Sequence, residues 1–292
     1  MARIKRKPLF GIALGGGARG FAHIGVLKVF EGEGIKPDVL SGTSMGGIIA
    51  ALYASGMSAR EIEEEAHRMG KLSNMVKLLD NDLTNFDHVF GSESIQEYFS
   101  ELLGGKKAFK DMEIPLALSA VDLNTGKEIV IQEGSVVEAI NATMALPGIV
   151  EPVERDGMVL TDGGTLNNVP SDLVKSMGTE KILAVDVHPD AADEAFWQEQ
   201  ALPSIAAVSW RSVHIMIGAI TEAKQRIAKT DLIIRPEIPS DVTTLTGFRK
   251  VDQVVDSGAK AALDKMPEIR KLVKERIYFF KREVSRAESM TL

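Results

Sequence analysis

The serine of a G-x-S-x-G motif is the side chain whose type and spacing point most directly to chemistry. The motif reads GTSMG at residues 42–46, where a short apolar run gives way to helical periodicity. In a nucleophile elbow of this form, the serine sits on a sharp turn between a strand and a helix with its hydroxyl exposed. Ser44 is therefore the candidate nucleophile, and Gly42 and Gly46 give the turn the room it needs.

A second glycine-rich loop, GGGARG at residues 15–20, follows the first apolar run. Its spacing satisfies the dinucleotide fingerprint G-x-G-x-x-G, but the N–H groups of such a loop can also hold the oxyanion of an ester under attack. A dinucleotide fold places a carboxylate at the end of its second strand, and here the serine turn takes that place. We therefore expect an oxyanion hole, with Arg19 steadying its charge or, as we favour, pinning the loop to carbonyl groups. The expected residues of this hole are Gly15, Gly16, Gly17 and Arg19.

A serine hydroxyl needs a base within hydrogen-bond reach, and two residues are candidates for that base. His188 ends the apolar run ILAVDVH and would complete the chain order serine, aspartate, histidine of α/β-hydrolases. Asp162 ends another apolar run and is followed by Gly163 and Gly164, a pattern that is also typical of a simple turn. From the residues alone, both candidates stay open.

The other ionisable residues near predicted strand ends and helices have structural interpretations. His23 shares a helix face with apolar neighbours and is expected beneath the glycine loop, His67 and His88 lie in polar segments, and His214 lies on a helix face typical of a core or an interface. Asp122 and Asp186 follow strands and are assigned turn and packing roles. None of these residues is therefore a preferred catalytic group.

The three glycine-containing motifs, taken in chain order, resemble those of the patatin-like phospholipases. They are residues 15–20, residues 42–46 and the third motif at residues 162–164, and the segment ATMALPGIVEPV at 142–153 is similar to the one that precedes the aspartate strand in that family. The resemblance covers roughly residues 10–170. The stretch DGGTLNNVPSD is closer to the bacterial lysophospholipase and neuropathy-target-esterase type than to plant patatins.

The resemblance implies a catalytic dyad of Ser44 and Asp162 without histidine, an oxyanion hole from the first glycine loop, and a three-layer α/β/α fold. It also implies hydrolysis of fatty-acyl esters of phospholipids or lysophospholipids through an acyl-enzyme, with no metal or organic cofactor. A carboxylate is a weak base toward an alcohol, so burial beside Ser44 must raise the pKa of Asp162. Two other functions stay open on this fold: a regulatory or lipid-binding protein with little turnover, and an acyltransferase.

Alternating apolar runs and helical segments predict a mostly parallel, mixed sheet covered by helices. A hairpin is expected around residues 124–126. The predicted strands are residues 9–14, 39–42, 116–121, 128–132, 159–161, 182–187 and 232–234. The predicted helices are residues 21–31, 45–54, 136–144, 171–176, most of 204–227, a helix beginning near 92, and most of the chain after 251.

Composition limits the class of protein further. The chain has no cysteine, which excludes disulfides, thiolate zinc sites and a cysteine nucleophile, and its net charge of -7 argues against general nucleic-acid binding. No apolar run is long enough to cross a bilayer, and the basic start only imitates a secretory signal. We expect a cytoplasmic protein with a catalytic domain over residues 8–236 and a helical extension over 237–292 packed on the same domain.

Two helical segments are candidates for contact with a lipid surface or another chain. Residues 270–286 carry an excess of basic residues beside an apolar stripe, which fits a helix packed on the core or one lying on the inner face of a membrane. Residues 204–220 are apolar on more than one face, which fits the core, the interface of a homo-oligomer or a lid. Apolar residues between 75 and 86 are a candidate wall of the substrate channel, and residues 80–87 lack the pattern of a calcium loop.

Overall fold

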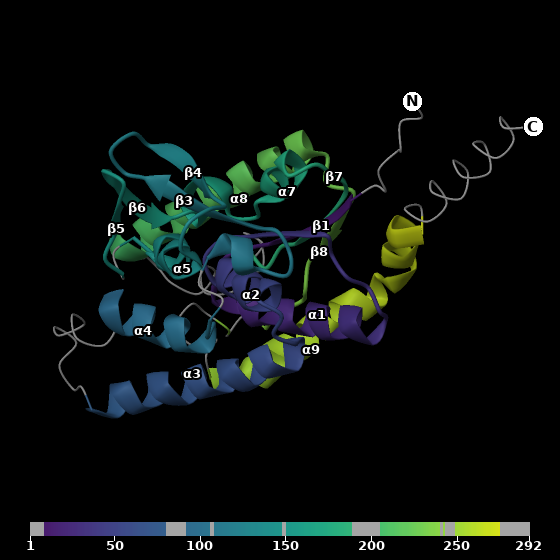
Figure 1. The fold of residues 1–292 in the computed structure, drawn as a ribbon, viewed down its shortest axis with the longest axis horizontal. Helices are drawn as coiled ribbons and strands as arrows, with labels where there is room; N and C mark the ends of the chain where they lie inside the picture. The colour runs from purple at the N-terminus through teal and green to yellow at the C-terminus, as the bar shows by residue number, and fades with distance from the viewer. Residues whose placement is uncertain are drawn as a thin grey trace, which may run out of the picture.

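The chain folds as one mixed sheet with helices on both of its sides, which confirms the expected three-layer α/β/α architecture (Figure 1). This computed structural model describes residues 9–79, 92–105, 108–147, 150–188, 205–239, 242 and 249–274.

Within the described residues the sheet has eight strands in the order β5-β6-β3-β2-β1-β7-β8, with β4 paired to β3 outside this path. The central neighbours β3, β2, β1, β7 and β8 run parallel, whereas β4 and β6 pair with β3 antiparallel and β5 pairs with β6 antiparallel. The bounds are β1 (Leu9–Leu14), β2 (Val39–Gly42), β3 (Leu116–Asp122), β4 (Lys127–Ile131), β5 (Val153–Arg155), β6 (Met158–Asp162), β7 (Thr179–Val185) and β8 (Leu232–Ile234).

The central strands read as continuous apolar runs because both of their faces are covered. Every residue of β2 and β3 is buried, and so is β1 after its first residue. The β3–β4 hairpin pairs Leu118 with Ile131 and Asp122 with Lys127, and Gly126 in its turn has a φ of 66°. The predicted hairpin is confirmed.

The helices divide into two layers by their contacts. In the first layer, α1 contacts α3 and α9, α2 contacts α5, and α5 contacts α4; in the second, α8 contacts α6 and α7. The first layer holds α1 (Ala22–Gly32), α2 (Met45–Ala54), α3 (Ala59–Leu79), α4 (Ser92–Leu102), α5 (Val136–Met144) and α9 (Val251–Asp264). The second holds α6 (Gly164–Asn167), α7 (Ser171–Ser176) and α8 (Ile205–Ala228), and the short 3-10 helix η1 (Ala18–Phe21) precedes α1.

Helix α9 packs on α1 at glycine positions, so that the two backbones approach closely. A Cβ atom added to Gly25 would lie 1.9 Å from the carbonyl oxygen of Val255, and one added to Gly258 would lie 1.9 Å from that of Ala22. The C-terminal part of the chain therefore packs on the helix that follows the first glycine loop. The predicted boundary between a catalytic domain at residues 8–236 and a helical extension at 237–292 stays a prediction.

Several elements differ from the sequence-based expectations. Strand β5 and helices α3 and α6 were not predicted. Helix α8 exists as predicted, but the interpretation as a core helix is wrong for one face, where Ile205, Val208, Ile215 and Met216 are 88%, 43%, 52% and 55% exposed. Residues 80–87 and the part of the predicted basic segment beyond residue 274 lie outside the described residues, as do the side chains of 75–79.

A helix that spans a bilayer must be both long and strongly apolar. Among the helices that the structure describes, none combines the length and hydropathy that a bilayer-spanning segment needs.

Candidate active site

Ser44 lies on a sharp turn between β2 and α2 and has an unusual backbone conformation. Its φ of 54° and ψ of -128° place a non-glycine residue in a sparsely populated region, as a nucleophile elbow requires. The flanking glycines are required by space: a Cβ on Gly42 would lie 2.5 Å from the carbonyl oxygen of Gly46, and one on Gly46 would lie 2.3 Å from that of Leu14. The elbow therefore rests directly on the end of β1.

Parallel pairing places the two glycine turns side by side. Leu14 of β1 is the register partner of Gly42 of β2, so both strands end at the same edge of the sheet. A Cβ on Gly16 would lie 2.9 Å from the Cβ of Ser44. The first glycine loop thus touches the candidate nucleophile, as the strand order predicted.

Hydrogen bonds within the protein already occupy two of the N–H groups that were expected to form the oxyanion hole. The Gly15 N–H donates to the carbonyl of Val185 and the Gly16 N–H to that of Asn168, each at 3.0 Å, so neither donor faces a substrate in this conformation. Gly17 is exposed and has a φ of 124°, and no acceptor among the described residues takes its N–H. Of the three glycines, Gly17 is the one whose N–H has no acceptor among the described residues, so the composition of the oxyanion hole stays a prediction.

Arg19 and His23 hold the loop in place. The Arg19 Nε donates to the carbonyl of Val242 at 3.1 Å, which agrees with the favoured pinning role. His23 is fully buried, and its Nε2 donates to the carbonyl of Gly15 at 2.7 Å. Burial lowers the pKa of His23 to about 4, so the ring is neutral near pH 7 and acts as a structural donor beneath the loop.

Asp162 reaches Ser44 from a strand that runs against β3. It ends β6, where it pairs with Ala120, two residues beyond the β3 partner of Gly42. Asp162 is 2% exposed, its carboxylate lies beside the Ser44 hydroxyl, and its Oδ1 accepts a hydrogen bond from the Gly164 N–H at 2.7 Å. Burial raises the pKa of Asp162 to about 6, against the opposing effects of the Ser44 hydroxyl and the Gly164 N–H.

The glycine after Asp162 is also fixed by space. A Cβ on Gly163 would lie 2.4 Å from the carbonyl oxygen of Ser119 in β3. The third motif therefore needs glycine to bring the carboxylate down onto the sheet edge.

His188 does not occupy the place beside Ser44. Its backbone N–H donates to Asp186 at 3.1 Å, and its ring lies against the His214 ring of α8, with centroids 5.6 Å apart. The structure brings Asp162, rather than His188, to the serine hydroxyl. Asp186 also accepts from Arg235, and Asp122 accepts from Thr125 in the hairpin turn, so the packing and turn roles of both aspartates are confirmed.

The remaining histidines lie apart from the elbow. The His67 Nε2 lies 3.0 Å from Asp252 of α9, which joins α3 to α9, and His214 packs beside His188. His88 lies outside the described residues.

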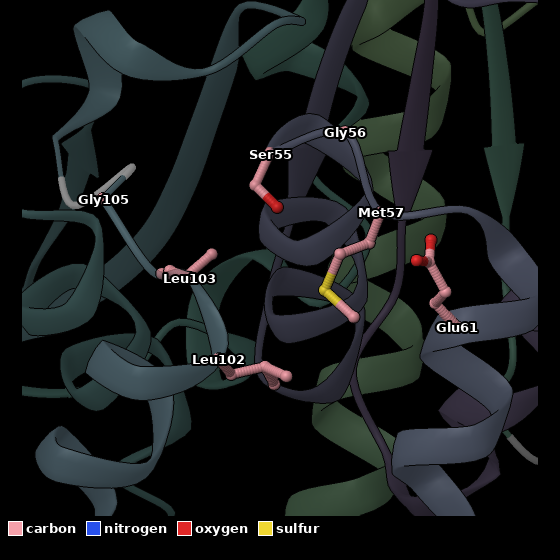
Figure 2. A pocket seen from close by; sticks show the side chains of 7 residues that line it. All are labelled: Ser55, Gly56, Met57, Glu61, Leu102, Leu103 and Gly105. Atoms are coloured by element: carbon pink, nitrogen blue, oxygen red, sulfur yellow. The ribbon is translucent and has the colours of Figure 1, made fainter.

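A pocket of about 270 Å³ is lined in part by the residues that follow the last residue of α2, Ala54 (Figure 2). Since α2 has ten residues, its two ends are about 15 Å apart. This pocket therefore does not open on the serine. Its lining residues are Ser55, Gly56, Met57, Glu61, Leu102, Leu103 and Gly105.

Sequence reasoning missed three residues that support the elbow. The Ser44 N–H donates to the Thr143 hydroxyl at 3.0 Å, and the backbone carbonyls of Asn167 and Asn168 accept from Thr43 and Gly16. The asparagine pair lies inside the third-motif stretch, so its position was a usable signal. Thr143 stands on α5, at the start of the segment 142–153 that resembles the family, but nothing in that segment pointed to a contact with Ser44.

Comparison with known proteins agrees with this arrangement of the three motifs. A family model described as patatin-like phospholipase matches residues 14–175, which contain all three turns around Ser44. The chain belongs to the patatin-like phospholipase family. The resemblance drawn from the motifs is confirmed.

Relatives come from animals and bacteria. Patatin-like phospholipase domain-containing protein 6 is 30% identical over 269 residues in Homo sapiens and 34% identical over 270 residues in Mus musculus. Each alignment covers 84% of this chain and 19% of the relative. An uncharacterised NTE family protein of Mycobacterium tuberculosis is 32% identical over 203 residues, which cover 68% of this chain and 54% of that protein. The chain thus spans about a fifth of the mammalian proteins and about half of the mycobacterial one.

Solved structures resemble the chain more distantly. VipD from Legionella pneumophila aligns over 89% of this chain and 67% of its own, with 12% identity and a TM-score of 0.47. The type III effector protein ExoU aligns over 93% of this chain and 53% of its own, with 16% identity and a TM-score of 0.41. Likenesses at this level carry no conclusion about the reaction.

Proposed function

We propose that this chain is a serine lipid acyl hydrolase that cleaves fatty-acyl ester bonds of phospholipids or lysophospholipids through an acyl-enzyme. The observation that carries the proposal is the placement of the buried Asp162 carboxylate beside the Ser44 hydroxyl, at the sheet edge where the first glycine loop touches the serine. Membership of the patatin-like phospholipase family supports a lipid hydrolase activity. The names of the relatives, which include phospholipase-domain and NTE family proteins, support the same class of substrate.

In the first half-reaction, the Ser44 oxygen attacks the ester carbonyl carbon while its proton passes to Asp162. The tetrahedral oxyanion accepts hydrogen bonds at the mouth of the first glycine loop, where Gly17 offers its N–H, and it lies near the positive N-terminal end of α2. Protonated Asp162 then gives its proton to the departing alkoxide. This step leaves the acyl group on Ser44 and releases the alcohol product.

In the second half-reaction, water attacks the acyl-enzyme carbonyl and Asp162 accepts the proton of that water. Collapse of the second tetrahedral intermediate returns the proton to Ser44 and releases the fatty acid. Burial gives Asp162 a pKa of about 6, which makes it a stronger base than an exposed aspartate while leaving it ionised near pH 7.

Labelling with a long-chain fluorophosphonate tests the dyad directly. Intact mass spectrometry should find one adduct on the wild type and on His188→Ala, and none on Ser44→Ala. Asp162→Asn should label at least 100-fold more slowly, because its amide cannot accept the serine proton. Failure of folded wild-type protein to label would favour a lipid-binding protein with little turnover. Loss of labelling in His188→Ala but not in Asp162→Asn would identify the histidine as the base.

Product analysis distinguishes hydrolysis from acyl transfer. A hydrolase releases free fatty acid in the presence of added alcohol or thiol acceptors, whereas an acyltransferase passes the acyl group to them. We expect free fatty acid as the main product.

Helix α8 supports a proposal about where the lipid meets the protein. Its exposed face presents Ile205, Val208, Ile215 and Met216 over a stretch whose single charged residue is Arg211. A lipid surface would bury this apolar area and accept a basic residue beside it. We therefore keep the expectation of a cytoplasmic protein that contacts a membrane surface, and we assign the contact to α8.

A further inference from the structure

A cluster of charged side chains lies on β4, α7 and α8, elements that the sequence analysis did not connect to the turn that carries Ser44. It consists of Glu128 from β4, Asp172 from α7 and Lys224 from α8. The Lys224 ammonium donates to the Asp172 Oδ2 at 3.1 Å and to the Glu128 Oε2. The three side chains are 18% to 32% exposed, so they are largely removed from water.

Asn167 connects this cluster to the residue that precedes the nucleophile. Its Nδ2 donates to the Glu128 Oε1 at 2.6 Å and to the Asp172 Oδ1 at 2.7 Å, which uses both hydrogens of the amide. Its backbone carbonyl accepts from the Thr43 hydroxyl at 2.8 Å. The cluster therefore fixes one flank of the turn that carries Ser44.

Ser119 connects the same carboxylate to the other flank. Its hydroxyl donates to the Glu128 Oε1 at 3.0 Å, and its carbonyl accepts from the Thr143 hydroxyl at 2.6 Å. Thr143 in turn accepts from the Ser44 N–H at 3.0 Å. Ser119 also supports the turn after Asp162, because Gly163 packs against its carbonyl. One oxygen of Glu128 thus joins two routes that end on either side of the dyad.

We propose that Glu128, with Lys224 as its counter-ion, is a positioning residue for the Ser44–Asp162 dyad. The inference rests on the proposed function. Ser44 holds a backbone conformation that few residues adopt, and such conformations persist only where the surroundings fix them from several sides. Thr43 and Thr143 supply two of these fixed points, and both lead back to Glu128. Glu128 touches no reacting atom in this arrangement, so it acts through its neighbours.

The charge of the cluster matters because its carboxylates and its ammonium lie away from water. Removing Lys224 leaves Glu128 and Asp172 close together without a counter-ion, which favours their separation. Glu128→Gln keeps the shape and one acceptor oxygen for Asn167 and Ser119, but it weakens each hydrogen bond because the acceptor is no longer ionised. The two changes therefore perturb the elbow by different routes.

The test uses steady-state hydrolysis of a short, water-soluble p-nitrophenyl ester, with circular dichroism and thermal melting on each variant. We expect Glu128→Gln to lower kcat about tenfold and Glu128→Ala about 100-fold, with KM within twofold of the wild type. Lys224→Met should also lower kcat about tenfold, and adding Glu128→Gln to it should lower kcat by less than the product of the two single effects. Glu64→Gln, which removes an exposed ion pair with Arg60 on α3, is the matched control and should leave kcat unchanged.

The outcomes separate this inference from the proposed function. A folded Glu128→Gln with kcat within twofold of the wild type overturns the positioning role. A kcat that falls only in proportion to the folded fraction also overturns it, because the cluster then supports the fold alone. Glu128→Ala can fail to fold, and Glu128→Gln keeps the test decisive in that case. A folded wild type with neither turnover nor fluorophosphonate labelling overturns the proposed function, and this inference with it.

Discussion

In the proposed mechanism Asp162 must be ionised to accept the proton of Ser44, and burial raises the pKa of Asp162 to about 6. Below that pH the carboxyl is protonated and cannot act as a base, so kcat/KM should rise with pH through about 6 and level off above it. The measurement is the pH profile of kcat/KM on a soluble ester, with His188→Ala as the control. An acidic limb that disappears in His188→Ala would assign the titration to the histidine instead.

Burial of Asp162 also predicts that the free energy of unfolding falls as the pH rises, whereas the activity rises. Because the folded pKa lies above the ordinary 3.8 of aspartate, ionised Asp162 destabilises the fold above pH 6, and the destabilisation fades as the pH falls toward 3.8. A shift of this size corresponds to about 3 kcal/mol at most. Asp162→Asn should therefore raise the free energy of unfolding at pH 8 and raise it less at pH 5. Urea denaturation of both proteins at pH 8 and pH 5 measures this change in the free energy of unfolding. A change that is equal at the two pH values, or a destabilisation by Asp162→Asn, would contradict the raised pKa.

At the scale of elements, the exposed apolar face of α8 predicts that one negative charge introduced on it weakens lipid binding. Ile215→Glu should lower the fraction bound to anionic phospholipid vesicles several-fold and leave hydrolysis of a soluble ester unchanged, since Ile215 is 52% exposed. Leu263→Glu on α9, at 56% exposure, is the matched control. If vesicle binding persists while light scattering shows that Ile215→Glu separates a dimer, the face binds a second copy instead.

The elements that could be predicted were those fixed by their own residues. Strands β1 and β2 and helix α2 follow from apolar runs that end in glycine turns, and their predicted bounds agree with the structure. Strand β5, with its sequence VER, has no apolar pattern and forms because it pairs with β6. Helix α6 has four residues, too few for a periodic signal. Pairing and packing, rather than local preference, decide such segments.

In the candidate site, too, local motifs could be predicted and long-range contacts could not. Ser44 and Asp162 could be named because their motifs are local, and the choice of Asp162 over His188 came from the family resemblance. The occupied N–H groups of Gly15 and Gly16 could not be predicted, since their acceptors are carbonyls of Val185 and Asn168 far along the chain. Local motifs identify the chemical groups, and the tertiary hydrogen bonds decide which of them are available.

For the whole molecule, the close packing of α9 on α1 predicts a position that tolerates no side chain. Gly258→Ala would bring a Cβ within 1.9 Å of the Ala22 carbonyl oxygen, so the helices must separate, at a cost of about 1–3 kcal/mol or more. Gly32→Ala, in the last turn of α1 with nothing within 4 Å of the added Cβ, is the matched control and should be neutral or stabilising. Chemical denaturation compares them, and equal effects would contradict the packing.

The strand order has a consequence for how the proposed activity is lost when the protein begins to unfold. Ser44 follows a central strand, whereas Asp162 ends β6, which is held to β3 by three residue pairs and flanked on its other side by the three-residue edge strand β5. Partial opening of this edge would remove the base while the serine turn stays folded. Hydrolysis should therefore disappear at lower urea concentration than the helical signal, and amide exchange should be faster in β6 than in β2. Coincident activity and helical transitions would mean that the dyad melts only with the whole molecule.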